Sequence, residues 1–349
     1  MMFSSARFGW LFPILSVALL ACTDNANPGG GAGGSSTGAG GTSGGAGGSG
    51  GSGATVAGAG GTSGLAGSGG SAGGASGGTN GGMSGSGNTA GSAGSAGSSG
   101  SGGSGPTSSS GCGSPTTLKS GTFNIDVDGT EREYILSMPD NYDPMKPYKL
   151  IFGFHWRGAN AIDIENNDFY GLRDVADDTA IFVSPDSFGD GWTNTGGEDI
   201  AFTLALVNYL KAEACVDESR IFSLGFSYGG MMSFAVGCAL GDTFRAIAPF
   251  AGALYSGCED GTAPVAMWGA HGYSDGADGV VGIEDGRDGL AVFLERNGCS
   301  DETVMVEPDE CVAYQGCMAG YPVTWCEWDG GHSTPPFATN AVWEFFSQF

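Results

Sequence analysis

The sequence predicts an α/β fold in which helices cover both faces of a mostly parallel central sheet. Between residues 112 and 349, short apolar runs typical of buried strands alternate with longer runs typical of helices. This part of the chain is long enough to build one hydrophobic core. Polar residues gather where the predicted strands end, and functional sites of such folds form at the carboxyl ends of strands.

The first predicted elements are two strands within residues 121–139, joined at Asp128-Gly129, a dipeptide that favours a tight turn. The remaining strands of the sheet are predicted at residues 149–156, 180–185, 220–226, 244–252, 264–272 and 322–331. Helices are predicted at residues 170–179, 198–214, 228–240, 286–298 and 340–349. Glu198 and Asp199 begin the second of these helices, where acidic side chains complement the helix dipole.

Two segments precede this domain. Residues 1–21 hold one early charge, Arg7, and an apolar run too short for a membrane-spanning helix, which is typical of a signal peptide. The run ends "LLAC", which resembles the bacterial lipobox, so we expect a lipoprotein signal and a lipidated Cys22. The alternative is an ordinary signal peptide followed by an incidental cysteine. Thr23, rather than Asp, follows the cysteine and favours export to the outer membrane.

Residues 22–111 consist mainly of Gly, Ser, Ala and Thr. Such a segment has too few apolar side chains to offset the entropy of ordering it, so we expect a disordered, flexible tether. Together with the signal, this tether predicts an outer-membrane or cell-surface lipoprotein, or a secreted protein. Any membrane contact is expected only through the lipid anchor.

The cysteine pattern favours disulfide bonds. Eight of the nine cysteines follow Cys22, and an even number in an exported chain indicates a disulfide framework. Cys311 and Cys326 flank two strand-like runs around a turn, so they could face each other across a hairpin. Cys299 and Cys317 would then close a neighbouring loop, and the other pairings stay open. No cysteine or histidine cluster suggests a metal, and we predict no cofactor.

The net charge of −25 lies almost wholly after the tether. Such a surface repels nucleic acid and anionic membranes, so we expect neither as a partner. The same surface favours a neutral or weakly acidic polymer as the partner. We also expect the protein to be a monomer.

A candidate nucleophile lies in "LGFSYGGMM", where Gly225–Gly229 fits the pattern Gly-x-Ser-x-Gly. The same pattern recurs by chance in the Gly- and Ser-rich tether. Only Ser227 follows a predicted strand and precedes a predicted helix, which is the context of a nucleophile elbow. A serine hydroxyl needs a base, and the base needs a partner that orients it.

Both partners are found downstream in the order expected of an α/β-hydrolase. Asp275 follows the strand at 264–272, and His332 follows the last strand. Asp278 and Asp285 are the alternatives for the acid. His271, at the end of the same strand, is a further histidine near Asp275.

The loop after the strand at 149–156 is predicted to complete an oxyanion hole. The backbone N–H of Tyr228, with that of Trp156 or Arg157, would hold the developing negative charge. We further predict that His155 and Trp192 contact the substrate, with Trp192 lining an apolar slot for an acyl ring. The alternative for Trp192 is packing within its loop.

Long motifs between residues 120 and 349 resemble the fungal-type feruloyl esterases of carbohydrate esterase family one. They include "LIFGFHWRGANA", "GWTNTGGEDIAFT", "SRIFSLGFSYGGMMSFAVGCAL", "AHGYSD" and "DGGHSTP". Polyhydroxybutyrate depolymerases and acetylxylan esterases are related to these enzymes. The resemblance implies the α/β-hydrolase fold, no metal, and a triad of Ser227, Asp275 and His332. Phe226 and Gly331 stand where the tannase-like group has bridged cysteines, so this chain is not of that group.

The expected function is therefore an exported serine carboxylester hydrolase that releases hydroxycinnamic acid from a plant cell-wall polysaccharide such as xylan. An acetylxylan esterase and a polyhydroxybutyrate depolymerase are the alternatives within the same chemistry. A non-catalytic, surface glycan-binding protein on a hydrolase scaffold is the alternative of another class.

Overall fold

The structure is a computed structural model that describes residues 107–258, 261–276 and 281–349. All of these residues fall in one compact unit of the chain. The predicted signal peptide, Cys22 and the tether up to residue 106 lie outside the described residues. Among the residues described, no helix combines the length and the apolar character needed to cross a membrane.

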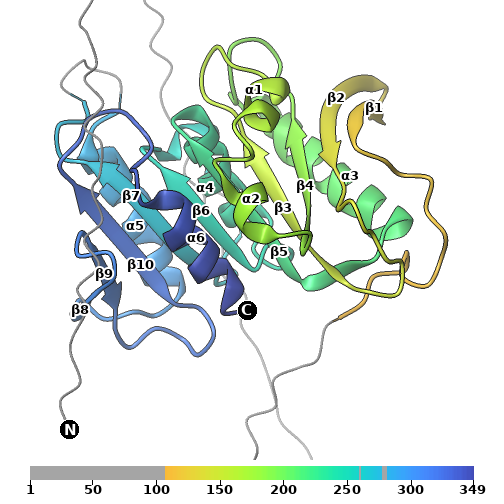
Figure 1. Cartoon of the computed structure of the whole chain (residues 1–349). Helices are drawn as coiled ribbons and strands as arrows, with labels where there is room; N and C mark the ends of the chain where they lie inside the picture. Colours follow the sequence, from red (N-terminus) through yellow and green to blue (C-terminus); the bar gives the residue numbers. More distant parts are fainter. Residues whose placement is uncertain (1–106, 259–260, 277–280) are drawn as a thin grey trace, which may run out of the picture. The chain divides into compact units, whose positions relative to one another are not determined.

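One mixed sheet forms the centre of this unit (Figure 1). Its order in the described part of the chain is β1-β2-β4-β3-β5-β6-β7-β10-β9-β8. The strands are β1 (Gly121–Val127), β2 (Thr130–Ser137), β3 (Tyr148–Phe154), β4 (Ala180–Pro185), β5 (Val216–Phe226), β6 (Ala246–Phe250), β7 (Ala266–Gly272), β8 (Thr303–Val306), β9 (Cys311–Tyr314) and β10 (Val323–Trp328). The run from β4 to β10 is parallel, and antiparallel strands flank it at both edges.

Helices cover both faces of the sheet, as the sequence predicts (Figure 1). The helices are α1 (Ala161–Asn166), α2 (Leu172–Ala176), α3 (Glu198–Glu213), α4 (Tyr228–Ala239), α5 (Ile283–Arg296) and α6 (Ala338–Ser347). Apolar side chains of α1, α2 and α6 share one core with the sheet, while α3, α4 and α5 pack in the cores of the opposite face. Parallel strands buried on both faces explain the continuous apolar runs in the sequence.

The carboxyl ends of the parallel strands all lie on one side of the sheet, so the loops that follow β3, β5, β7 and β10 are brought together there. This arrangement positions the candidate site. The predicted hairpin at Asp128-Gly129 is confirmed, and both residues adopt left-handed backbone angles. Helix α1 was not predicted, although Asn160 and Asp163 cap it reciprocally and form a recognisable start signal.

The predicted boundary of the tether at residue 111 is wrong. Ser108 forms a bridge with Asp217, Ser109 N donates to Val216 O, and Gly111 N donates to Lys211 O. Residues 107–111 therefore belong to the folded domain. The Ser109 hydroxyl adds to these backbone bonds, because it donates to Ala214 O at 2.9 Å and accepts from Val216 N at 3.0 Å. Small polar residues can join a domain in this way because backbone groups and short hydroxyl side chains find buried hydrogen-bond partners.

The described residues form four disulfide bonds. The predicted pairs Cys311–Cys326 and Cys299–Cys317 are confirmed, and Cys311 lies directly opposite Cys326 in the β9–β10 ladder. The pairs left open in the sequence are Cys112–Cys215 and Cys238–Cys258. The first closes the longest loop and fastens the start of the domain beside β5.

Candidate active site

Ser227 lies on a sharp turn between β5 and α4. Its backbone has φ 57° and ψ −117°, a region that non-glycine residues rarely adopt and that marks functional sites. The turn is held because Ser227 N donates to Phe250 O at 3.0 Å. The flanking glycines are required by close backbone approach: a Cβ at Gly225 would lie 2.3 Å from Gly229 C, and one at Gly229 would lie 2.1 Å from Phe154 O.

A continuous hydrogen-bond chain joins Ser227, His332 and Asp275. The Ser227 hydroxyl lies 2.8 Å from His332 Nε2, and His332 Nδ1 lies 3.0 Å from each carboxylate oxygen of Asp275. Because a carboxylate can only accept, Nδ1 carries the proton and Nε2 is free to accept from the serine. This is the arrangement of a nucleophile, a base and an orienting acid.

Asp275 is positioned by the loop that follows β7. Its backbone N–H donates to Gly272 O, its carboxylate accepts from Gly276 N at 2.8 Å, and its side chain is fully buried. The alternative Asp285 is engaged elsewhere, since it accepts from Gly282 N at the start of α5 and from the Tyr255 hydroxyl. The alternative Asp278 lies outside the described residues.

His271 contacts the same carboxylate from the other side. It lies in β7, its side chain is fully buried, and its Nε2 is 3.0 Å from Asp275 Oδ2. Burial lowers the pKa of His271, and the nearby Asp275 carboxylate offsets only part of that effect. The imidazole is therefore neutral at neutral pH, and Asp275 lies between one buried and one partly exposed histidine.

The neutral state of His271 gives a testable pH dependence of stability. We expect the free energy of unfolding of the wild type to fall, relative to that of His271→Asn, as the pH drops below about 6.5, the ordinary histidine pKa. The unfolded chain then binds a proton that the buried imidazole resists, which favours unfolding. Urea unfolding of both proteins from pH 8 to pH 5 measures the difference.

The comparison of the two proteins isolates His271. Four other titratable groups face His271 and are present in both proteins, so their contributions to the difference in unfolding free energy largely cancel. These groups are Asp275, His332, Asp285 and Glu327. A stability difference that stays constant across this pH range would contradict a buried neutral imidazole.

The backbone donors predicted for the oxyanion hole lie beside Ser227. Tyr228 is the first residue of α4, where N–H groups have no acceptor within the helix. Trp156 and Arg157 follow β3, and with Ser227, Tyr228 and His332 they line one cavity. The loop is fixed because Gly158 N donates to Asp190 O. The structure thus brings the predicted donors to the serine, and their catalytic role stays a proposal.

The prediction that His155 and Trp192 contact the substrate is wrong. Both side chains are fully buried, so neither reaches a ligand. His155 Nδ1 donates to Trp156 O at 2.9 Å, while its Nε2 accepts from Ser187 N at 3.2 Å. Trp192 Nε1 donates to His155 O at 2.9 Å, so it packs within the domain as the alternative interpretation held. The two residues fix the loop that carries Trp156.

Sequence reasoning missed Tyr170. Its buried hydroxyl donates to Phe154 O at 2.6 Å and accepts from Phe226 N at 3.1 Å. It thereby links the ends of β3 and β5, the two strands that lead into the predicted oxyanion donors and the nucleophile. The hydroxyl is aimed by three consecutive left-handed residues, Asp168, Phe169 and Tyr170, with φ of 49°, 53° and 60°. Such strain marks functional positions.

Replacing Tyr170 with Phe should lower kcat for ester hydrolysis by about tenfold with little change in KM. The Phe226 N–H would lose its buried acceptor, which should also lower the free energy of unfolding by about 1–3 kcal/mol. Tyr142→Phe is the matched control, because the Tyr142 hydroxyl also accepts from a backbone N–H, that of Cys215, at the opposite end of β5. An equal loss of stability in both variants with kcat unchanged in both would show that Tyr170 is merely structural.

The cavity at Ser227 has a volume of about 490 Å³ and is mainly apolar. Its lining includes the Met231, Tyr255 and Val281 side chains on the side of α4 and α5. A second hollow of about 540 Å³, also lined by His332, lies between the segment that leads from β10 into α6 and the residues that precede α2, Asn167, Tyr170 and Gly171. Trp156, Phe226 and His332 line both, so the two hollows adjoin at these residues as one groove, and Ser227 lines the first of them.

Comparison with known proteins places the chain in a family. The model of the prolyl oligopeptidase family, whose members are α/β-hydrolases, matches residues 186–264, which include Ser227. Feruloyl esterase C of Emericella nidulans is 39% identical over 258 residues, covering 68% of this chain and 91% of that protein. The chain belongs to the feruloyl esterase family. Feruloyl esterase D of Neurospora crassa is 37% identical over 265 residues, covering 69% of this chain and 90% of that protein.

The fold is shared more widely than the family. The acetyl xylan esterase from Aspergillus awamori superposes with a TM-score of 0.54 at 13% identity, over 65% of this chain and 99% of that chain. This likeness confirms the α/β-hydrolase fold. As a member of the feruloyl esterase family, the chain is a carboxylic ester hydrolase. The rings of Phe226 and His332 lie against each other, with their centroids 4.8 Å apart.

Proposed function

We propose that this protein is an exported serine esterase that releases hydroxycinnamic acid, ferulic acid in particular, from plant cell-wall polysaccharide. The observation that carries the proposal is the hydrogen-bond chain from Ser227 through His332 to Asp275, whose first two members line a mainly apolar cavity. The 39% identity to Feruloyl esterase C supports the choice of ester.

In the proposed mechanism, Ser227 Oγ attacks the ester carbonyl while His332 Nε2 takes its proton. The N–H of Tyr228 and that of Trp156 or Arg157 meet the oxyanion, and one such donor contributes about 3–4 kcal/mol in known enzymes. The bond to the sugar oxygen then breaks, and His332 returns the proton to that oxygen. Water repeats the sequence on the acyl enzyme, which frees the acid and restores the Ser227 hydroxyl.

The two halves of the groove would hold different parts of the ester. The leaving oxygen must reach His332 Nε2 to be protonated, so the sugar side of the ester lies against the loop that follows β10. That side offers the hydroxyls of Ser333 and Thr334, together with Pro335 and Pro336, a lining suited to a carbohydrate. The acyl ring then lies on the opposite side, against Met231, Val281 and Tyr255.

Export and anchoring belong to the same proposal. The four disulfide bonds are typical of an oxidising compartment. A lipidated Cys22 and the tether of residues 22–106 would hold the enzyme at a cell surface and let it reach an insoluble polymer. Mass spectrometry of the mature N-terminus tests the lipid directly.

Hydrolysis of methyl ferulate, an aryl acetate, acetylated xylan and hydroxybutyrate oligomers, measured side by side, tests the substrate. The proposal expects the highest kcat/KM for methyl ferulate and release of ferulic acid from arabinoxylan. Cleavage of acetylxylan or of the oligomers with methyl ferulate untouched would overturn it in favour of the corresponding esterase.

A further inference from the structure

Two loops at the carboxyl ends of strands each hold one half of the candidate active site. The loop between β4 and α3 holds the loop after β3 that carries the predicted oxyanion donors, because Asp190 O accepts from Gly158 N at 2.7 Å. The loop after β6 packs against the start of α4, since a Cβ at Gly252 would lie 2.7 Å from Gly230 C. The relative position of these two loops therefore affects where the oxyanion donors lie with respect to the Ser227 hydroxyl.

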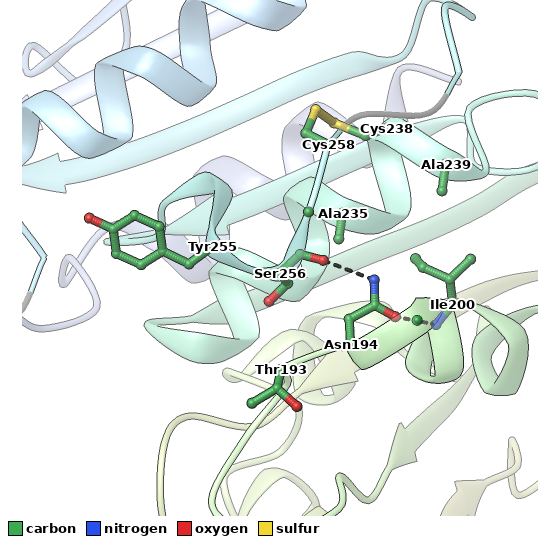
Figure 2. Close-up of a pocket in the computed structure, with 12 residues that line it drawn as sticks. Thr193, Asn194, Ile200, Ala235, Cys238, Ala239, Tyr255, Ser256 and Cys258 are labelled. Carbon is green, nitrogen blue, oxygen red and sulfur yellow. Dashed lines mark hydrogen bonds between the residues drawn. A yellow bond between two sulfur atoms is a disulfide. The ribbon is translucent and has the colours of Figure 1, made fainter. Parts of the chain in front are cut away.

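Ser256, the last residue of the 3₁₀ turn η2 (Leu254–Ser256), joins the two loops. Its hydroxyl donates to Trp192 O at 2.6 Å. Its carbonyl oxygen accepts from Asn194 Nδ2 at 2.8 Å (Figure 2). Ser256 is only 2% exposed, so both bonds are shielded from water, and together they form a clamp between the loops. The clamp continues to the oxyanion donors, because Trp192 Nε1 donates to His155 O at 2.9 Å.

The other end of the clamp is fixed at the start of α3. Asn194 has left-handed backbone angles, and its Oδ1 accepts from Asp199 N and Ile200 N at 3.1 Å each (Figure 2). Its backbone N–H donates to Asp199 Oδ2 at 2.9 Å. Asp199 is in turn paired with Arg132 of β2 at 2.8 Å, and both side chains are buried. The clamp therefore ties the loop after β6 to an anchored part of the domain.

A cavity of about 360 Å³ lies beside the clamp, and both Asn194 and Ser256 line it (Figure 2). On this side the two loops are joined by hydrogen bonds next to an open space. The cavity leaves room for the loops to shift when one bond of the clamp is lost, because no close-packed wall resists the movement there.

We propose that Ser256 is a positioning residue that, through the clamp, sets the spacing between the oxyanion donors and Ser227. This inference rests on the proposed function for the identity of those donors. The donors act on the tetrahedral intermediate and its transition state, so a displaced donor lowers kcat and has little effect on substrate binding.

Two substitutions each remove one bond of the clamp. Ser256→Ala lacks the hydroxyl. In Asn194→Asp an oxygen replaces Nδ2, while the other oxygen can still accept from the N–H groups that begin α3. In both variants kcat for para-nitrophenyl acetate should fall by about tenfold, with KM changed by less than about twofold.

Ser109→Ala is the matched control for Ser256→Ala. Ser109 is 4% exposed, and its hydroxyl also donates to a backbone carbonyl, that of Ala214, at 2.9 Å. This bond lies beside the start of β5, at the end of the strand far from Ser227. The control removes a comparable buried hydrogen bond, and kcat should stay at the wild-type value.

Inhibition by an aryl trifluoromethyl ketone reports on the oxyanion donors directly. Ser227 Oγ adds to the carbonyl carbon, the serine proton passes to His332 Nε2, and the negative charge rests on the former carbonyl oxygen. In Ser256→Ala the dissociation constant of this adduct should rise by about the factor by which kcat falls, roughly tenfold. In Ser109→Ala it should equal that of the wild type. Urea unfolding of each variant establishes that the proteins compared are folded.

The outcomes separate the inference from the proposed function. Folded Ser256→Ala and Asn194→Asp with wild-type kcat and ketone affinity would overturn the inference alone. So would a lower kcat with unchanged ketone affinity, or an equal fall of kcat in Ser109→Ala, because the clamp would then have no specific effect on the oxyanion donors. A wild type that the ketone does not inhibit would overturn the proposed donors and the inference with them.

Discussion

Replacing Ser227 with Ala should lower kcat/KM for para-nitrophenyl acetate by about 10⁴-fold or more, the scale of nucleophile removal in serine hydrolases. The expectation follows from geometry, since the Ser227 hydroxyl is the group aligned with His332 Nε2 at 2.8 Å. The fold should persist, because Ala keeps the Cβ, and the Ser227 N–H bond to Phe250 O does not involve the side chain.

Covalent labelling gives the clearest measurement of this prediction. A fluorophosphonate probe should label the wild type at Ser227 and should not label Ser227→Ala. Ser223→Ala is a matched control, because Ser223 lies in β5, the strand that leads to Ser227, is fully buried, and has a hydroxyl with no hydrogen-bond partner among the described residues. It should retain both labelling and turnover.

Two outcomes would contradict the catalytic assignment. Labelling that survives in Ser227→Ala would place the nucleophile elsewhere in the chain. A folded wild type that neither reacts with the probe nor hydrolyses any ester would favour the glycan-binding alternative, in which the hydrolase scaffold only holds a polysaccharide.

The candidate triad could be predicted from the sequence because its signals are local and ordered. Each of Ser227, Asp275 and His332 follows a strand that an apolar run in the sequence predicts. Parallel strands bring their carboxyl ends together on one side of the sheet. The disulfide bond Cys311–Cys326 could be predicted for a similar reason, since a hairpin register places the two residues opposite each other.

The supporting residues could not be predicted because their roles depend on contacts between distant segments. Trp192 is a large aromatic residue in a loop, which suits a binding slot equally well, and only its packing against β3 and His155 shows that it is buried. Tyr170 links Phe154 to Phe226 across residues far apart in the chain. No local pattern indicates that its hydroxyl reaches both strand ends.

The second large effect is expected for Asp275→Asn, which should lower kcat by about 10⁴-fold, as the equivalent change does in a known triad. The carboxylate of Asp275 accepts from His332 Nδ1 and lies against His271 Nε2. An amide can offer only one oxygen. If the NH₂ group of the amide faces His332, this group donates to Nδ1. The proton of the imidazole then moves to Nε2, and Nε2 can no longer accept from the Ser227 hydroxyl.

Asp285→Asn tests whether this loss is specific to the acid that contacts His332. Asp285 was the alternative triad acid, but its carboxylate accepts from Tyr255 and from Gly282 N instead. Its replacement should lower kcat for para-nitrophenyl acetate by less than about tenfold, the order of one lost hydrogen bond. If Asp285→Asn were as inactive as Asp275→Asn while both remained folded, Asp275 would not be the acid that completes the hydrogen-bond chain from Ser227 through His332 during turnover. A slow fluorophosphonate reaction of Asp275→Asn, with Ser227 still the labelled residue, would locate the defect in the tautomer of His332 and leave the nucleophile itself in place.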